Sequence, residues 1–116
     1  MELNDSIGRA VTGLIEEIKK SDEYIRLMEI NKEVKSNPDI LKKIERTRQI
    51  RKQLSGMNEE ERESDYAERL EEEYDNLCDI TAVHEFSLAE LEFCNLYQKA
   101  IGRIVNSFDF DLSEIG

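Results

Sequence analysis

Apolar residues recur at spacings of three and four positions along most of the chain, which is the pattern of an α-helix with one buried face. The first such segment begins at Asn4 or Asp5 and ends at about Lys20, and its apolar positions are Ile7, Val11, Leu14 and Ile18. Gly8 and Gly13 interrupt it, and each costs up to ~1 kcal/mol relative to Ala inside a helix. We therefore expect a first helix whose initial turns are weak.

A second helix is expected from Ser21 to about Ser36. Ser21 is a suitable N-cap, and Asp22 and Glu23 after it match the positive end of the helix dipole. The apolar positions of this helix are Tyr24, Leu27, Met28, Asn31 and Val34. Asn31 is polar, which allows two interpretations: a partly exposed residue at the edge of the face, or a buried amide that fixes the helix register.

Asn37 and Pro38 end the second helix and begin a third, because Pro disfavours helical geometry in the residue before it but fits the first helical position. The third helix should end near residue 54, with an apolar face formed by Ile40, Ile44, Thr47, Ile50 and Leu54. Its other face is basic and comprises Lys42, Lys43, Arg46, Arg48, Arg51 and Lys52. After a loop at residues 55–58, Asn58 should cap an acidic fourth helix with apolar positions Tyr66, Leu70, Tyr74 and Leu77.

The pattern shifts phase at residues 79–81, where Thr81 could cap a fifth helix that ends near Ser107. One continuous helix over residues 59–107 is the alternative, because no Pro or Gly enforces a break there. The last helix has two adjacent apolar stripes: Phe86, Ala89, Phe93, Leu96, Ala100 and Ile104, and Leu91, Cys94, Ile101 and Val105. It is therefore either a central core helix or a helix shared between the core and a subunit interface, where Gly102 would let another backbone approach closely.

These elements predict an all-α fold with about five helices in an antiparallel helical bundle and a long C-terminal helix. A chain of 116 residues with 37% charged residues and one Pro is typical of one soluble helical domain. We place that domain at residues 1–108, followed by a loose acidic tail at residues 109–116. No apolar run approaches the ~20 residues that span a bilayer, and residues 1–5 lack signal-peptide features. We expect a cytoplasmic protein with no membrane partner.

The net charge of −11 is unevenly distributed. Residues 1–55 hold 12 Lys and Arg against 10 Asp and Glu, whereas residues 56–116 hold 4 against 17. Phosphate would be repelled by the second half, so nucleic acid is not an expected partner of the whole surface. We expect Arg46, Arg48, Arg51 and Lys52 to face acidic residues from 59–75 across a helical hairpin.

The sequence offers no recognisable catalytic, cofactor or metal site. Cys78 and Cys94 do not form a C-x-x-C pair and are expected to be plain buried thiols. His84 is the only histidine and is expected at the surface. The glycines form no phosphate-binding loop, the Glu runs lack the spacing of a calcium loop, and Glu90 lacks the Glu-x-x-His partner of a di-metal bundle. We expect no enzyme and no cofactor.

With these motifs placed, residues 7–107 resemble the YlbF/YmcA family of small helical bacterial proteins. The resemblance rests on an apolar first helix followed by Ser21-Asp22-Glu23-Tyr24, on Asn37-Pro38-Asp39 opening a helix with Ile44 and Gln53, and on Val83, Phe86, Ala89 and Glu90. It implies a non-enzymatic regulator that acts in a complex with related family members. It further implies links to competence, sporulation, biofilm formation, ribonuclease Y and mRNA processing.

Family members in that complex have been associated with iron–sulfur clusters through cysteines. This chain departs from them, because its last 22 residues contain no Cys, so no cluster is expected here. The family also includes paralogues of unassigned role, and this chain could be one of them.

Two functions from different classes remain. The first is a protein–protein interaction module that binds a second copy, as a dimer or larger oligomer, or a partner protein. The second is a nucleic-acid-linked factor that uses the basic face of the third helix, and the acidic second half favours the first. The candidate interface residues are Tyr24, Leu27, Asn31, Phe86, Leu91, Phe93, Leu96, Ile101 and Val105.

Overall fold

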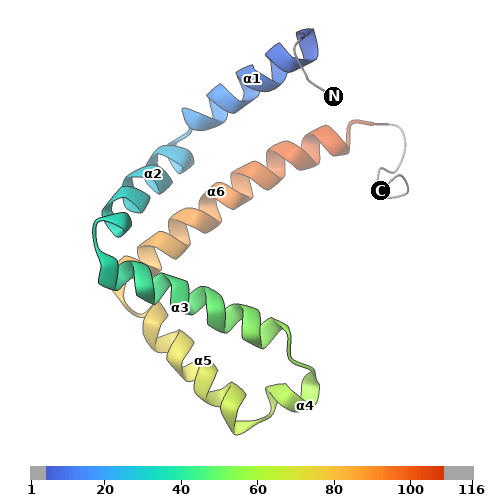
Figure 1. Cartoon of the computed structure of the whole chain (residues 1–116). Helices are drawn as coiled ribbons and strands as arrows, with labels where there is room; N and C mark the ends of the chain where they lie inside the picture. Colours follow the sequence, from blue (N-terminus) through green and yellow to red (C-terminus); the bar gives the residue numbers. More distant parts are fainter. Residues whose placement is uncertain (1–4, 109–116) are drawn as a thin grey trace. The chain divides into compact units, whose positions relative to one another are not determined.

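The computed structural model describes residues 5–108, which form six α-helices and no strand (Figure 1). In chain order these are α1 (Ser6–Lys19), α2 (Asp22–Lys35), α3 (Pro38–Ser55), α4 (Glu59–Arg62), α5 (Asp65–Cys78) and α6 (Thr81–Val105). The all-α class and the long C-terminal helix are confirmed, with one helix more than predicted. No helix within the described residues is long and apolar enough to cross a membrane.

The first three helices begin where the sequence predicts, and each is capped by a side chain. Asp5 accepts a hydrogen bond from the Ile7 amide at 3.1 Å at the start of α1. The Ser21 hydroxyl accepts from the Tyr24 amide at 3.2 Å before α2. At α3, Asn37 caps with Pro38 in the first helical position. Each cap satisfies an amide that would otherwise lack an intrahelical partner.

The acidic segment after residue 58 is two helices, so the prediction of one continuous fourth helix was wrong. Asn58 caps α4 as predicted and forms a reciprocal capping box with Glu61. The missed break lies at Ser64, whose hydroxyl accepts from the Ala67 amide at 3.2 Å and begins α5. Ser64 is a strong N-cap residue type, and it outweighs the helix-forming Glu and Arg residues before it.

The phase shift near residue 80 is a real helix boundary. α5 ends at Cys78, and α6 begins at Thr81. The alternative of one uninterrupted helix over residues 59–107 is therefore wrong. Thr81 is the first residue of α6 itself, so the prediction that it caps this helix was wrong by one position.

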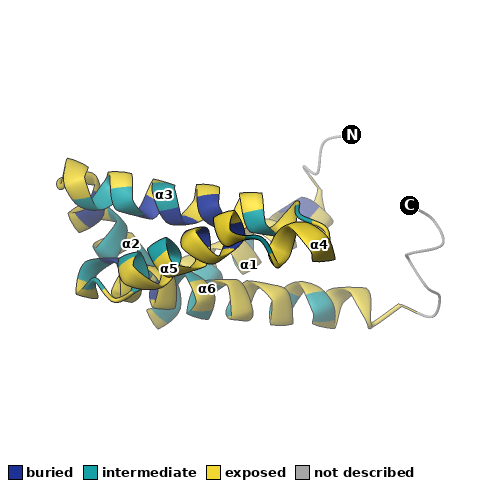
Figure 2. Cartoon of the chain, turned by 90° about the horizontal axis from the view of Figure 1, so that it is seen from below, coloured by how far each residue is buried: buried dark blue, intermediate teal, exposed yellow. Residues whose placement is uncertain are grey.

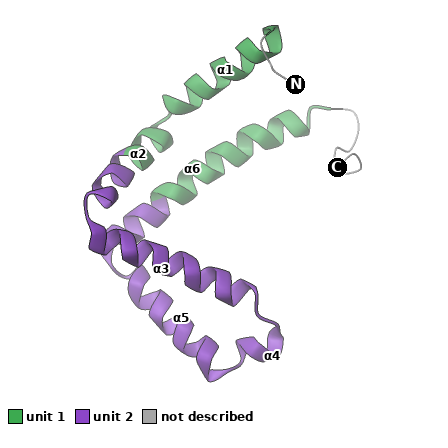
Figure 3. Cartoon of the chain, in the orientation of Figure 1, with its two compact units in different colours: residues 1–28, 89–116 green, residues 29–88 purple. Residues whose placement is uncertain are grey.

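The chain divides into two compact units (Figure 3). Unit 2, residues 29–88, contains the last part of α2, all of α3, α4 and α5, and the start of α6. Within it α3 packs most extensively against α5. Seven of its apolar residues are buried: Val34, Ile44, Ile50, Ala67, Leu70, Val83 and Phe86. Unit 2 thus has a hydrophobic core of its own.

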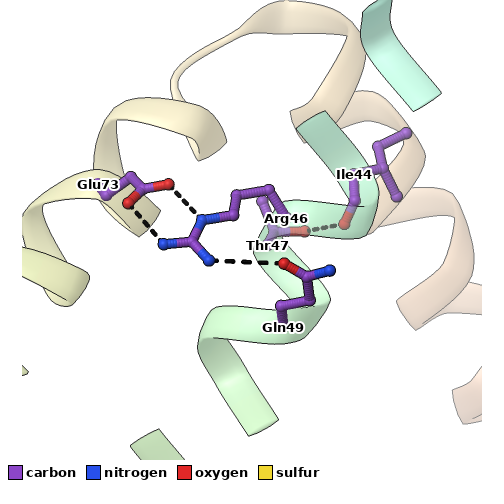
Figure 4. Close-up of polar contacts among 5 residues, drawn as sticks. All are labelled: Ile44, Arg46, Thr47, Gln49 and Glu73. Carbon is purple, nitrogen blue, oxygen red and sulfur yellow. Dashed lines mark hydrogen bonds and ion pairs between the residues drawn. The ribbon is translucent and has the colours of Figure 1, made fainter. Parts of the chain in front are cut away.

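Thr47 lies on the buried face of α3, where the sequence placed it among apolar residues, and is 5% exposed. Its hydroxyl donates to the Ile44 carbonyl at 2.6 Å (Figure 4). A buried hydroxyl without a partner would be costly, and this bond within the helix removes that cost.

Unit 1 consists of residues 1–28 and 89–116, of which the structure describes 5–28 and 89–108. Ala89 has its one buried hydrophobic side chain among those described, and Gly8 of α1 is buried as well. The C-terminal half of α6 is largely exposed (Figure 2). The single domain over residues 1–108 stays a prediction, and the tail predicted at residues 109–116 lies outside the described residues.

Candidate interaction surface

Unit 1 carries most of the exposed apolar surface among the described residues. Fourteen large apolar side chains are exposed in the described part of the chain. Two of them, Tyr66 and Leu88, belong to unit 2. The other twelve are Ile7, Val11, Leu14, Ile15, Ile25, Met28, Leu91, Tyr97, Ile101, Ile104, Val105 and Phe108. Large apolar patches on a protein surface mark interaction sites. We call these twelve residues the unit 1 apolar surface.

On α6 the two predicted stripes have different surroundings. In the first stripe, Phe86 and Ala89 are buried, whereas Ile104 at its C-terminal end is exposed. The second stripe, formed by Leu91, Cys94, Ile101 and Val105, is exposed throughout, with Leu91 at 56%. The interpretation of α6 as a purely central core helix was therefore wrong for its C-terminal half in the single chain.

Aromatic and charged contacts connect α2 to α6 within unit 1. The ring of Phe93 lies 5.7 Å from that of Tyr24 and 6.5 Å from that of Tyr97, measured between centroids. Arg26 and Glu92 form an ion pair at 3.4 Å between Nη1 and Oε2. Because both charged groups are solvent-exposed, this pair adds only ~0–1 kcal/mol. The rings therefore position the two helices more than the ion pair does.

A groove of about 390 Å³ lies beside the second half of α6. Leu14 of α1 lines one wall, and Ala100, Arg103, Ile104 and Ser107 line the other. Within unit 1, α1 and this half of α6 run in opposite directions along the chain (Figures 1 and 3). The two helices therefore turn apolar residues toward a shared space that their own side chains do not fill.

Gly102 was predicted to allow close approach of another backbone. A Cβ built at Gly102 would meet no atom within 4 Å. No segment of the described chain approaches this position, so the space beside it is open.

The nine predicted interface residues are divided between the two units. Leu91, Ile101 and Val105 are exposed in unit 1, and five residues are intermediate: Tyr24, Leu27, Asn31, Phe93 and Leu96. Phe86 is buried in unit 2, and Asn31 also belongs to unit 2. The partial exposure of Asn31 fits the edge of a stripe. The role of these residues in binding stays a prediction.

The predicted interface residues include none from α1, although the apolar stripe of this helix was recognised in the sequence. Ile7, at 60% exposed, and Ile15 and Leu14 are among the exposed apolar residues. The signal that could have found them is the strong separation of apolar and polar faces on α1, which is greater than on α2, α3, α5 and α6. An amphipathic helix needs a surface to cover its apolar face.

The basic face of α3 is partly occupied by contacts within unit 2. Arg46 donates to both carboxylate oxygens of Glu73, at 2.5 Å from Nε and 2.9 Å from Nη2 (Figure 4). These hydrogen bonds lower the pKa of Glu73 and raise that of Arg46. The predicted pairing of Arg46 with the 59–75 segment is confirmed.

Two further cations of α3 have local contacts. Lys43 pairs with Asp39 on its own helix at 2.9 Å. The guanidinium of Arg48 lies over the Phe86 ring of α6, 5.6 Å from its centroid. Charges held in this way are less available to phosphate groups. Pairing of Arg51 and Lys52 with the acidic segment stays a prediction.

The cysteines and the histidine lie at unremarkable positions. Cys94 is exposed and Cys78 is half-buried, so the prediction of two buried thiols was wrong. His84 is exposed in the first turn of α6. Among residues 5–108 no three His, Cys, Asp or Glu residues are grouped so that they could hold a metal ion.

Comparison with curated proteins and with solved structures found no match. The family model described as "Control of competence regulator ComK, YlbF/YmcA" matches residues 7–107. The match covers α1 to α6, including both units. The family is described by a regulatory role in competence, and its match spans most of the chain. The chain therefore belongs to the YlbF/YmcA family.

Proposed function

We propose that this chain is a cytoplasmic, non-enzymatic regulatory module that works by binding proteins through the unit 1 apolar surface. One observation carries this proposal: unit 2 has a buried core, whereas unit 1 exposes twelve large apolar side chains. Burying apolar surface is the main driving force of protein association. A module built in this way has a stable part and a part that is completed by a partner.

Family membership supports the choice of the process that it regulates. Competence is the role in the description of the family. Sporulation, biofilm formation and mRNA processing are further processes that we include in the proposal. Related family members and ribonuclease Y are candidate partners.

We propose that one partner is a second copy of this chain. A second copy would cover the twelve exposed side chains of the unit 1 apolar surface. A standard protein interface buries ~800 Å² on each partner and involves about 20–30 residues a side, so neighbouring residues of unit 1 would take part as well.

The geometry of unit 1 favours a helical partner. Two antiparallel helices cannot enclose a core between them, but four can. A second copy that packs its own α1 and α6 against this pair would complete an antiparallel four-helix arrangement. Gly102 would then be the position where the backbone of the second copy can approach most closely, since a Cβ built there meets no atom within 4 Å.

Charges on the two helices of the proposed interface balance locally, in spite of the net charge of −11. Helix α1 carries two basic and two acidic residues, and residues 89–105 carry the same number of each. Two such neutral surfaces can meet without a large Coulomb cost. Association should consequently tolerate salt, because it depends on apolar burial rather than on ion pairs.

A matched pair of variants on α6 tests the proposal. Ile104→Glu introduces a charge on the unit 1 apolar surface, at a side chain that is 44% exposed. Leu88→Glu introduces the same charge on the same helix in unit 2, at a side chain that is 37% exposed. Light scattering after size-exclusion chromatography should give a monomer for Ile104→Glu and a dimer for Leu88→Glu and the wild type.

The proposal fails if both variants remain dimers or if the wild type is a monomer at tens of micromolar. Circular dichroism of both variants confirms that each remains helical. A nucleic-acid function would instead require RNA binding that weakens steeply with salt and depends on the α3 cations.

A further inference from the structure

A small cavity in unit 2 has a lining of two chemical kinds. It measures about 170 Å³ and lies where the end of α2, the start of α3 and the start of α6 meet. Its apolar lining is Ile30, Val34, Ile40 and Ala82, and its polar lining is Glu33, Asn37 and Glu85. All seven residues belong to unit 2. We call it the unit 2 slot.

The two carboxylates of the slot are not neutralised within the described chain. Neither the Glu33 nor the Glu85 side chain forms an ion pair or hydrogen bond with another described residue. The amide oxygen of Asn37 accepts from the Ile40 amide at 3.4 Å, so it is committed to capping α3. Two exposed carboxylates from different helices therefore line the same cavity as four apolar side chains, and neither forms an ion pair with another described residue.

The volume and the lining of the slot limit which kinds of ligand can bind there. It is smaller than the ~300–1,000 Å³ of a site for a drug-sized ligand. A calcium ion takes 6–8 oxygen ligands, which two carboxylates cannot supply. An anion would be repelled. What fits is a long apolar stem that ends in a cation, because such a stem packs on apolar surface while its head reaches carboxylates.

We propose that the unit 2 slot receives a Lys or Arg side chain from a partner protein. The aliphatic stem lies on Val34, Ile40 and Ala82, and the charged head donates hydrogen bonds to Glu33 and Glu85. Arg is the better occupant, because its planar guanidinium can donate to two carboxylates at once. The slot shares no residue with the unit 1 apolar surface and would give the module a second, charge-selective contact with its partner.

The test uses the full chain and two short peptides. The probe is the peptide acetyl-Ala-Ala-Arg-Ala-Ala-amide, and its control replaces the arginine by citrulline, which has the same shape but no charge. Methyl NMR resonances of Ile30, Val34, Ile40 and Ala82 report occupancy. The arginine peptide should shift these resonances saturably at millimolar concentration. Citrulline should bind at least about tenfold more weakly, as expected when charge-assisted hydrogen bonds are lost.

A double variant and its matched control locate the effect. Glu33→Gln with Glu85→Gln removes both charges with little change in shape and should weaken the arginine peptide by about tenfold or more. Glu59→Gln with Glu60→Gln removes two charges from α4, outside the slot, and should leave binding unchanged. Equal binding of the citrulline peptide, or unchanged binding by the slot variant, would overturn the proposal. So would the absence of saturable shifts in the four reporter residues.

Discussion

Replacing Ile50 and Ile104 by Ala, one at a time, should separate the self-supporting unit from the one that needs a partner. Ile50 is 0% exposed in unit 2, and its substitution removes three carbon atoms from a filled core. At ~0.8 kcal/mol per methylene this transfer loss is ~2.4 kcal/mol. The cavity left behind brings the expected total within the ~2–5 kcal/mol found for such changes. This loss should not depend on protein concentration.

Ile104 is 44% exposed in the single chain, so about half of the transfer loss applies there. Ile104→Ala should therefore cost only ~1 kcal/mol in a monomer. In a dimer that covers this side chain the cost should rise toward the full ~2.4 kcal/mol, because the remaining surface is buried there too.

Urea denaturation at low and high micromolar concentration, followed by circular dichroism, measures both effects. The midpoint for Ile50→Ala should be lowered by the same amount at each concentration. The deficit of Ile104→Ala should grow with concentration, because only the associated state contains its buried contacts. An equal deficit for both variants at low concentration would refute the assignment of the core to unit 2. A concentration-independent deficit for Ile104→Ala would refute its burial in a dimer.

Three further predictions concern other features. The pKa of Glu73 is lowered in the folded state because Arg46 donates hydrogen bonds to its carboxylate. Ionised Glu73 therefore stabilises the fold above its unfolded pKa, and this stabilisation is lost as the pH falls through the folded pKa. Glu73→Gln should flatten this part of the acid denaturation curve. Ser64→Ala should lower stability by ~1 kcal/mol, because α5 loses its N-cap, and an unchanged urea midpoint would contradict this. Gly13→Ala and Gly102→Ala should each stabilise the isolated chain by ~0.5–1 kcal/mol, since both have open space at Cβ; only Gly102→Ala should weaken self-association, as measured by sedimentation.

Helix type and most boundaries were predictable because capping residues act locally. Asp5, Ser21 and Asn37 each cap a helix within three residues, with no contribution from distant contacts. Ser64 was missed because the acidic residues around it are themselves good helix formers. A cap inside such a sequence competes with helix continuation, and the sequence pattern alone does not show which one prevails.

The distribution of burial was less predictable, because it depends on which helices meet. The two stripes of α6 look alike in sequence, but Phe86 is buried and Leu91 is 56% exposed. The apolar face of α1 was recognised as periodic, and periodicity does not reveal whether a face is covered within the same chain. The pairing of Arg46 with Glu73 was predicted from the charges on either side of a short loop. The position of Arg48 over the Phe86 ring was not predicted, because the two residues lie 38 positions apart in the sequence.

Hydrogen exchange at two protein concentrations tests the central claim most directly. If a second copy covers the unit 1 apolar surface, amides in residues 6–19 and 89–105 should exchange more slowly at high concentration than at low concentration. Amides of α3 and α5 should show little change, because the core of unit 2 is complete within one chain. Exchange in residues 6–19 and 89–105 that is the same at both concentrations, together with a mass of 13.6 kDa at tens of micromolar, would contradict the account.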